Sequence, residues 1–194
     1  MAFCCANFLL YNIDALVARP VYMCETSPGS DEYEVCTFEV ICESEPPIKY
    51  YIDWDDVDSL NNWVEQLDLT CVSDERIELM SKVYYLGEIV GCLLIARIPD
   101  LFGRKVPIST SITIQFFVYL TIILSRDIDL STGLGFFMGV LHIGIYNGGY
   151  INVCEYVHTR WKNSACTVLL AFDMTTQIIS AIYWRYISKN WLYL

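Results

Sequence analysis

The stretch YYLGEIVGCLLIARIPDLFGRK, residues 84–105, decides the fold of this chain because an apolar helix in it runs into a short basic turn. Its first part is apolar enough to span a bilayer and carries Gly87 and Gly91 one helical turn apart. Its last part, residues 100–105, contains a glycine followed by two basic residues. This order predicts a membrane helix, a tight basic turn and a second apolar helix.

Four segments of the chain are long and apolar enough to cross a bilayer, which takes about 20 helical residues. We predict helices over residues 77–98, 107–125, 132–155 and 164–187. We interpret residues 1–18 as a truncated first membrane helix, because this stretch lacks the basic start and the small-residue cleavage site of a signal peptide. Buried helices of a soluble protein are the alternative, but four such segments with short connectors favour a multi-pass integral membrane protein.

The negative charge of the chain is concentrated in one segment. The whole chain has a formal net charge of -11, yet residues 19–76 hold fifteen acidic and three basic side chains, while the rest holds eight acidic and nine basic ones. Neither part supplies the basic surface that binds phosphate, so we expect no nucleic-acid partner. Within the acidic segment, Trp54 to Leu69 has the apolar spacing of a helix, and we predict a short amphipathic helix there.

Four of the nine cysteines lie in this acidic segment: Cys24, Cys36, Cys42 and Cys71. An even number of cysteines in a polar segment with Pro and Gly predicts two disulfides if the segment faces an oxidising compartment. The sequence does not choose among the three connectivities. We interpret the other cysteines as small core residues. No Cys-X-X-Cys pair occurs, so we predict neither a metal site nor a cofactor.

Basic residues predict the orientation of the chain in the membrane. The connector after the first predicted span of residues 77–98 holds Arg104 and Lys105, and the connector after the third holds Arg160. Because Lys and Arg are enriched in cytosolic loops, both connectors are predicted to lie in the cytosol. Residues 19–76 then lie outside the cell, which agrees with the disulfide prediction.

Two carboxylates fall inside the predicted spans, at Glu88 and Asp173. A charged carboxylate in the middle of a bilayer costs roughly 2.5 kcal/mol or more, so each must face a partner, water or a cavity. Asp173 begins a polar stripe that continues at helical spacing through Gln177 to Trp184. The alternative reading of each carboxylate is a protonated group that hydrogen-bonds to a neighbouring helix.

The preceding predicted helix carries a similar stripe of His142, Tyr146 and Tyr150. Carboxylates beside aromatic faces bind organic cations through charge pairing and cation–π attraction. We therefore predict that the two stripes and Glu88 together form a substrate site for a small organic cation.

Small residues recur one turn apart in the predicted helices, which lets neighbouring helices approach closely. The pairs are Gly87 and Gly91, Gly135 and Gly139, and Gly144 and Gly148.

The basic turn resembles the loop between the second and third membrane helices of the major facilitator superfamily of transporters. The family pattern runs roughly G-x-L-a-D-r-x-G-R-k. Four positions match it: Asp100, Gly103, Arg104 and Lys105. Ala96 and Leu101 depart from it.

The larger pattern is similar to the organic cation/carnitine transporter branch of that superfamily. A first helix precedes a long Cys-rich loop, and Gly139, Gly144, Glu155 and Arg160 stand at positions typical of the branch. Gly135 departs from it, because the branch usually has an intramembrane arginine at that position.

This resemblance implies an all-α membrane fold, namely a partial six-helix half-bundle of a twelve-helix transporter with an extracellular Cys-rich loop. Residues 77–187 would supply helices two to five, and residues 188–194 would lead into the sixth. The implied partners are the lipid bilayer, a small organic ion and the missing carboxyl-terminal half of the same transporter. We expect a plasma-membrane protein that does not transport with this chain alone.

The resemblance also implies an ion pair between Arg104 and Glu155 that locks one conformation. Asp100 would lose its partner in the missing half and instead hold the turn from Gly103 to Lys105.

Two other functions stay open from the sequence. The chain would fit a non-transporting truncated membrane protein, or a transporter of the same superfamily for sugars or other solutes. An enzyme is not indicated, because the sequence has two histidines and lacks a G-x-S-x-G elbow and a phosphate-binding loop.

Overall fold

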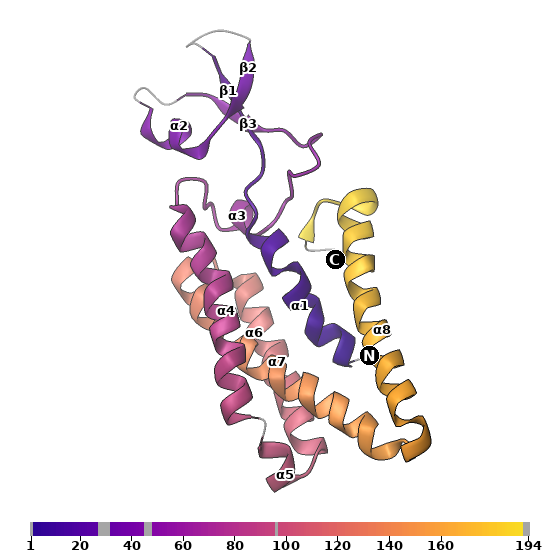
Figure 1. Cartoon of the computed structure of the whole chain (residues 1–194). Helices are drawn as coiled ribbons and strands as arrows, with labels where there is room; N and C mark the ends of the chain where they lie inside the picture. Colours follow the sequence, from indigo (N-terminus) through magenta and orange to yellow (C-terminus); the bar gives the residue numbers. More distant parts are fainter. Residues whose placement is uncertain (1, 27–31, 45–47, 96, 192–194) are drawn as a thin grey trace. The chain divides into compact units, whose positions relative to one another are not determined.

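The computed structural model describes residues 2–26, 32–44, 48–95 and 97–191 (Figure 1). The chain divides into two compact units. The first, called here the helical unit, comprises residues 1–13 and 78–180. The second, the disulfide unit, comprises residues 14–77 and 181–194.

Helices account for most of the described chain, and their positions follow the predicted segments closely. The long ones are α1 (Ala2–Val17), α4 (Asp74–Leu94), α6 (Lys105–Leu124), α7 (Ile128–Tyr156) and α8 (Lys162–Ile182). A 3₁₀ turn, η1 (Thr159–Trp161), precedes α8, and a π-helical turn, η2 (Tyr183–Ile187), follows it.

Three stretches of the described chain are long and apolar enough to cross a membrane: Lys105–Leu124, Ile128–Tyr156 and Thr159–Ile187. The first predicted span is not among them, although most of it is helical. Its helix, α4, has Glu78, Lys82 and Glu88 in its last 18 residues, which lowers its hydropathy. The structure thus supports three of the four predicted spans.

The predicted helix over residues 77–98 is wrong at its carboxyl end, because α4 stops at Leu94 and a short helix, α5 (Ile98–Phe102), follows. Pro99 lacks an N–H donor and suits the first turn of a new helix better than the interior of α4. The chain then turns through Gly103, whose φ of 81° lies in the left-handed region that glycine adopts without strain.

Helices α4 and α7 cross at backbone contact distance (Figure 1). A Cβ atom on Gly87 of α4 would lie 2.2 Å from the carbonyl oxygen of Phe136, and one on Gly139 of α7 would lie 2.1 Å from that of Tyr84. No larger residue fits either position without separating the helices. The prediction for Gly135 is wrong, because a Cβ atom there would meet no atom of the described chain within 4 Å.

The other predicted small residues also lie at helix contacts. A Cβ atom on Gly91 would lie 2.7 Å from the carbonyl oxygen of Val140 on α7. On the opposite side of α7, one on Gly144 would lie 2.5 Å from the hydroxyl of Ser111 in α6, and one on Gly148 would also meet α6. Helix α7 is therefore packed closely between α4 and α6.

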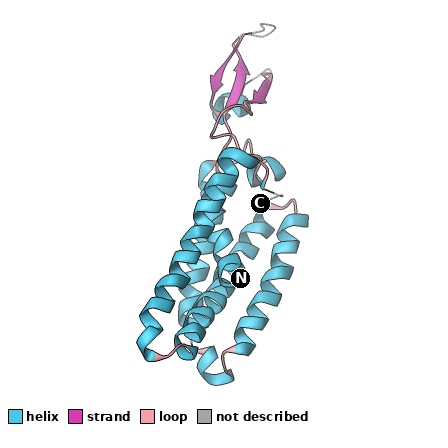
Figure 2. Ribbon diagram, turned by 90° about the vertical axis from the view of Figure 1, so that its right-hand side faces the viewer, coloured by secondary structure: helices cyan, strands magenta, loops and turns pink. Residues whose placement is uncertain are grey.

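The disulfide unit contains a small antiparallel sheet, where the sequence predicted only a Cys-rich loop (Figure 2). Its strands are β1 (Tyr22–Glu25), β2 (Tyr33–Cys36) and β3 (Tyr50–Ile52), in the order β2-β1-β3. Each strand has three or four residues and begins with a tyrosine, a residue that favours extended backbone. Two short helices, α2 (Phe38–Glu43) and α3 (Trp63–Gln66), complete the unit.

The amphipathic helix predicted from Trp54 to Leu69 is wrong in extent, since only α3 is helical within this range. The carboxylates of Asp53 and Asp56 accept hydrogen bonds from backbone N–H groups two residues further on, at 3.0 Å and 2.9 Å. These turns compete with helix for the same backbone donors. The helix begins only after Asn62, whose side chain accepts a hydrogen bond from the N–H of Val64 and caps it.

Candidate functional site

A buried carboxylate lies in the helical unit, where α1 contacts α8. The Asp173 side chain is 1% exposed, and the hydroxyl of Tyr11 donates a hydrogen bond of 2.7 Å to its Oδ2 atom. Two turns further along α8, the amide of Asn12 donates a hydrogen bond of 3.0 Å to the Ser180 hydroxyl. Polar contacts therefore join the two helices at both points.

A second carboxylate, Glu88 on α4, pairs with His142 on α7. The distance between His142 Nδ1 and Glu88 Oε1 is 2.7 Å, and their side chains are 4% and 19% exposed. The close approach of α4 and α7 at Gly139 places these two side chains against each other. The ring of Tyr84 lies 6.5 Å from that of His142, so the pair is bordered by an aromatic residue.

Tyr146 lies between the two carboxylates. Its ring centroid is 5.8 Å from that of His142, and its hydroxyl lies within electrostatic range of Asp173. Five side chains from four helices thus form a continuous group, called here the polar band. Its members are Tyr11, Glu88, His142, Tyr146 and Asp173.

The polar band includes four of the seven predicted substrate-site residues. Gln177 is exposed. The buried residues of α8 form a single line along the helix, with one residue in every seven: Cys166, Asp173 and Ser180. Gln177 lies beside this line, and its predicted role stays a prediction.

The other two predicted residues lie elsewhere in the described structure. Tyr150 is half-buried next to the sulfur atoms of Cys154 and Cys166. Trp184 belongs to the disulfide unit, where it lines a cavity of about 430 Å³ with Arg19 and Leu60 among others. Their predicted contacts with substrate stay predictions.

Tyr11 is the member of the polar band that the sequence analysis missed. Its helix was predicted only as a truncated first span, with no role for Tyr11. Adjacent polar side chains, Tyr11 and Asn12, in a mostly apolar stretch were the available signal.

A charge cluster lies where α5 leads into α6, at the end of α7. The Arg104 guanidinium forms two hydrogen bonds with Glu155, of 2.7 Å and 3.2 Å, and lies 2.9 Å from the Asp100 carboxylate. The predicted proximity of Arg104 and Glu155 is therefore confirmed, as is the contact of Asp100 with the turn. The hydrogen bonds that Arg104 donates to Glu155 raise the pKa of Arg104 above its ordinary value.

The cluster borders a cavity of about 550 Å³. Its lining residues are Arg104, Lys105, Ile108, Ser109, Asn152, Glu155 and Tyr156. Arg160 lies in η1, with its guanidinium 5.8 Å from the ring of Trp161. The part that Lys105 and Arg160 play in a conformational change stays a prediction.

The four cysteines of the acidic segment form two disulfides, as predicted. Cys24 pairs with Cys36 and Cys42 with Cys71, with Cα–Cα distances of 5.7 Å and 5.6 Å. The structure thereby selects one of the three connectivities that the sequence left open.

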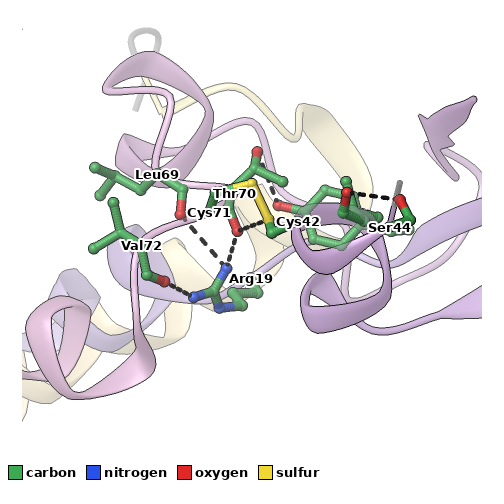
Figure 3. The surroundings of a disulfide bond; sticks show 9 residues. Arg19, Cys42, Ser44, Leu69, Thr70, Cys71 and Val72 are labelled. Atoms are coloured by element: carbon green, nitrogen blue, oxygen red, sulfur yellow. Dashed lines mark hydrogen bonds between the residues drawn. A yellow bond between two sulfur atoms is a disulfide. The ribbon is translucent and has the colours of Figure 1, made fainter. Parts of the chain in front are cut away.

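Arg19 organises the chain around the Cys42–Cys71 bond (Figure 3). Its guanidinium donates hydrogen bonds to the carbonyl oxygens of Thr70, at 2.8 Å, and Val72, and forms an ion pair of 2.6 Å with Asp74. The guanidinium also lies 3.8 Å from the ring centroid of Phe38. One side chain thus connects α2, the loop after α3 and the start of α4.

The described part of the chain contains no group of three or more His, Cys, Asp or Glu side chains with the geometry of a metal site.

Comparison with known proteins gives no matching family model and no matching solved structure. The chain is 26% identical over 144 residues to organic cation/carnitine transporter 6 of Arabidopsis thaliana, which covers 73% of the chain and 28% of the relative. It is 29% identical over 117 residues to organic cation/carnitine transporter 5 of the same plant, and the match covers 60% of the chain and 23% of the relative. It is 26% identical over 113 residues to organic cation transporter 1 of Caenorhabditis elegans, and the match covers 54% of the chain and 18% of the relative.

The chain thus spans about a quarter of the length of the curated relatives that it matches. The relatives are transporters, as the turn motif and the Cys-rich segment predict. The resemblance of this chain to organic cation and carnitine transporters is therefore confirmed.

Proposed function

We propose that this chain is the amino-terminal membrane part of a transporter for small organic ions, with cations preferred over carnitine-like zwitterions. The observation that carries the proposal is the buried Asp173 carboxylate, which two tyrosines border inside a unit of apolar helices. A carboxylate buried among membrane helices is typical of a substrate or ion pathway, and its charge would attract an organic cation.

The polar band supplies both attractions that a quaternary amine can use. Such an amine has no N–H donor, so it binds through charge pairing and through contact with aromatic faces. Asp173 offers the charge, and Tyr11 and Tyr146 offer the rings. The low dielectric around a buried carboxylate strengthens its attraction to a cation compared with an exposed one.

The proposed topology places the charge cluster in the cytosol and residues 19–76 outside the cell. In this arrangement the pair of Arg104 and Glu155 holds the cytosolic end in one conformation and separates when that end opens. Transport requires alternating access between two halves of the protein. The chain would therefore act together with a carboxyl-terminal half, in the plasma membrane, and would be inactive alone.

Uptake of a labelled quaternary amine by the full-length transporter in vesicles tests the proposal. Asp173→Asn removes the charge but keeps the size, and we expect uptake to fall about tenfold, equivalent to about 1.4 kcal/mol of lost interaction. Asp129→Asn is the matched control, because Asp129 is exposed at the start of α7 and should not affect uptake.

Two results would contradict the proposal. Unchanged amine uptake by the Asp173→Asn protein would remove Asp173 from the site. Uptake of organic anions alone would overturn the substrate class.

A further inference from the structure

A pair of cysteines outside the two disulfides lies at the junction of α7 and α8. Cys154 is in the last turn of α7, and Cys166 is in the second turn of α8. Their sulfur atoms are 2.7 Å apart, against about 2.05 Å in a covalent disulfide. Both are free thiols in the structure.

The surroundings of the two thiols differ in exposure. Cys166 is 8% exposed, whereas Cys154 is half-buried. Tyr150, one turn before Cys154, hydrogen-bonds with the sulfur atoms, and the ammonium of Lys162 lies within electrostatic range of Cys154. The thiolate is the reactive form of a cysteine, and the more exposed of two thiols is the one that a reagent meets. Cys154 is thus the thiol that a reagent reaches first, and Cys166 is its neighbour.

We infer that Cys154 and Cys166 form a reversible thiol–disulfide site that links the end of α7 to the start of α8. The oxidant would be a small disulfide such as oxidised glutathione. The Cys154 thiolate attacks one sulfur atom of this disulfide, forms a mixed disulfide and releases one small thiol. The Cys166 thiolate then attacks the Cys154 sulfur and releases the second. Two electrons and two protons pass from the protein to the oxidant.

A Cys154–Cys166 disulfide would constrain the last turn of α7, which also carries part of the charge cluster. Glu155, which pairs with Arg104, directly follows Cys154, and the bond would tie the end of α7 to α8 across η1. The chemistry of the pair does not depend on the proposed function. An effect of this oxidation on transport would rest on the proposed function.

Equilibration of the purified chain with oxidised glutathione in detergent, followed by peptide mapping, tests the inference. We expect one linked peptide pair containing Cys154 and Cys166, lighter than the two separate thiol peptides by about 2 Da for two lost hydrogen atoms. In Cys166→Ser, Cys154 should instead carry a glutathione adduct. Cys92→Ser is the matched control, because Cys92 lies on α4 and the linked pair should be unchanged.

Several outcomes with the unaltered chain would overturn the inference, provided that circular dichroism shows it to be helical. They are separate glutathione adducts on Cys154 and Cys166, persistence of both as free thiols in excess oxidised glutathione, and linkage of either to a different cysteine.

Discussion

The helical unit and the disulfide unit are stabilised by different means. In the helical unit, glycines allow direct backbone contact between helices, and buried polar side chains pair across them. In the disulfide unit, two covalent bonds and the contacts of Arg19 connect short strands and loops. The difference follows from the proposed surroundings. Lipid supplies little hydrophobic driving force between helices, whereas a small segment in water buries too little apolar surface without cross-links.

The largest expected effect concerns the disulfide unit. Replacing Cys42 and Cys71 by serine opens a loop with a sequence separation of 29 residues. Chain entropy then lowers the free energy of unfolding of this unit by about 3.6 kcal/mol. The corresponding change at Cys24 and Cys36, with a separation of 12 residues, should cost about 2.9 kcal/mol. Chemical denaturation, monitored by Trp fluorescence, measures both.

The helical unit should respond little to either pair of serines. Suppose that the loss of the Cys42–Cys71 bond lowered the free energy of unfolding of the helical unit by as much as that of the disulfide unit. The contrast between the two units would then be wrong. An equal loss for both cysteine pairs would instead contradict the dependence on loop length.

A somewhat smaller effect is expected from glycine replacement in the helical unit. Gly139→Ala places a Cβ atom 2.1 Å from the Tyr84 carbonyl oxygen, so α4 and α7 must separate. We expect the free energy of unfolding in detergent to fall by about 3 kcal/mol, the upper part of the range for overpacked sites. Gly135→Ala is the matched control on the same helix. It should be neutral or slightly stabilising, because no described atom beyond its own stretch of α7 lies within 4 Å of the new Cβ and alanine favours helix.

Equal destabilisation by Gly139→Ala and Gly135→Ala would show that backbone contact does not determine the stability of this unit. Thermal unfolding followed by circular dichroism in one detergent gives the comparison directly.

The same contrast explains which features the sequence predicted. Long apolar segments are strong signals, so the three most apolar helices were predicted correctly. The contact of Arg104 with Glu155 was predicted from the family resemblance, and the structure has it. Strands of three or four residues have too few positions to show a period, so the sheet was missed. The site was predicted in part. The position of a carboxylate inside an apolar span identified Asp173, but only the packing of α1 shows that Tyr11 is its partner.

The smallest expected effect tests whether polar contacts stabilise the helical unit at all. Tyr11→Phe removes the hydroxyl that donates to Asp173 but keeps the ring. A buried polar group that loses its hydrogen-bond partner costs about 1–3 kcal/mol, so we expect the free energy of unfolding to fall by about 1.5 kcal/mol. Tyr156→Phe is the matched control, because Tyr156 is 86% exposed and should not matter. A Tyr11→Phe protein as stable as the Tyr156→Phe protein would mean that backbone packing alone holds α1 against α8.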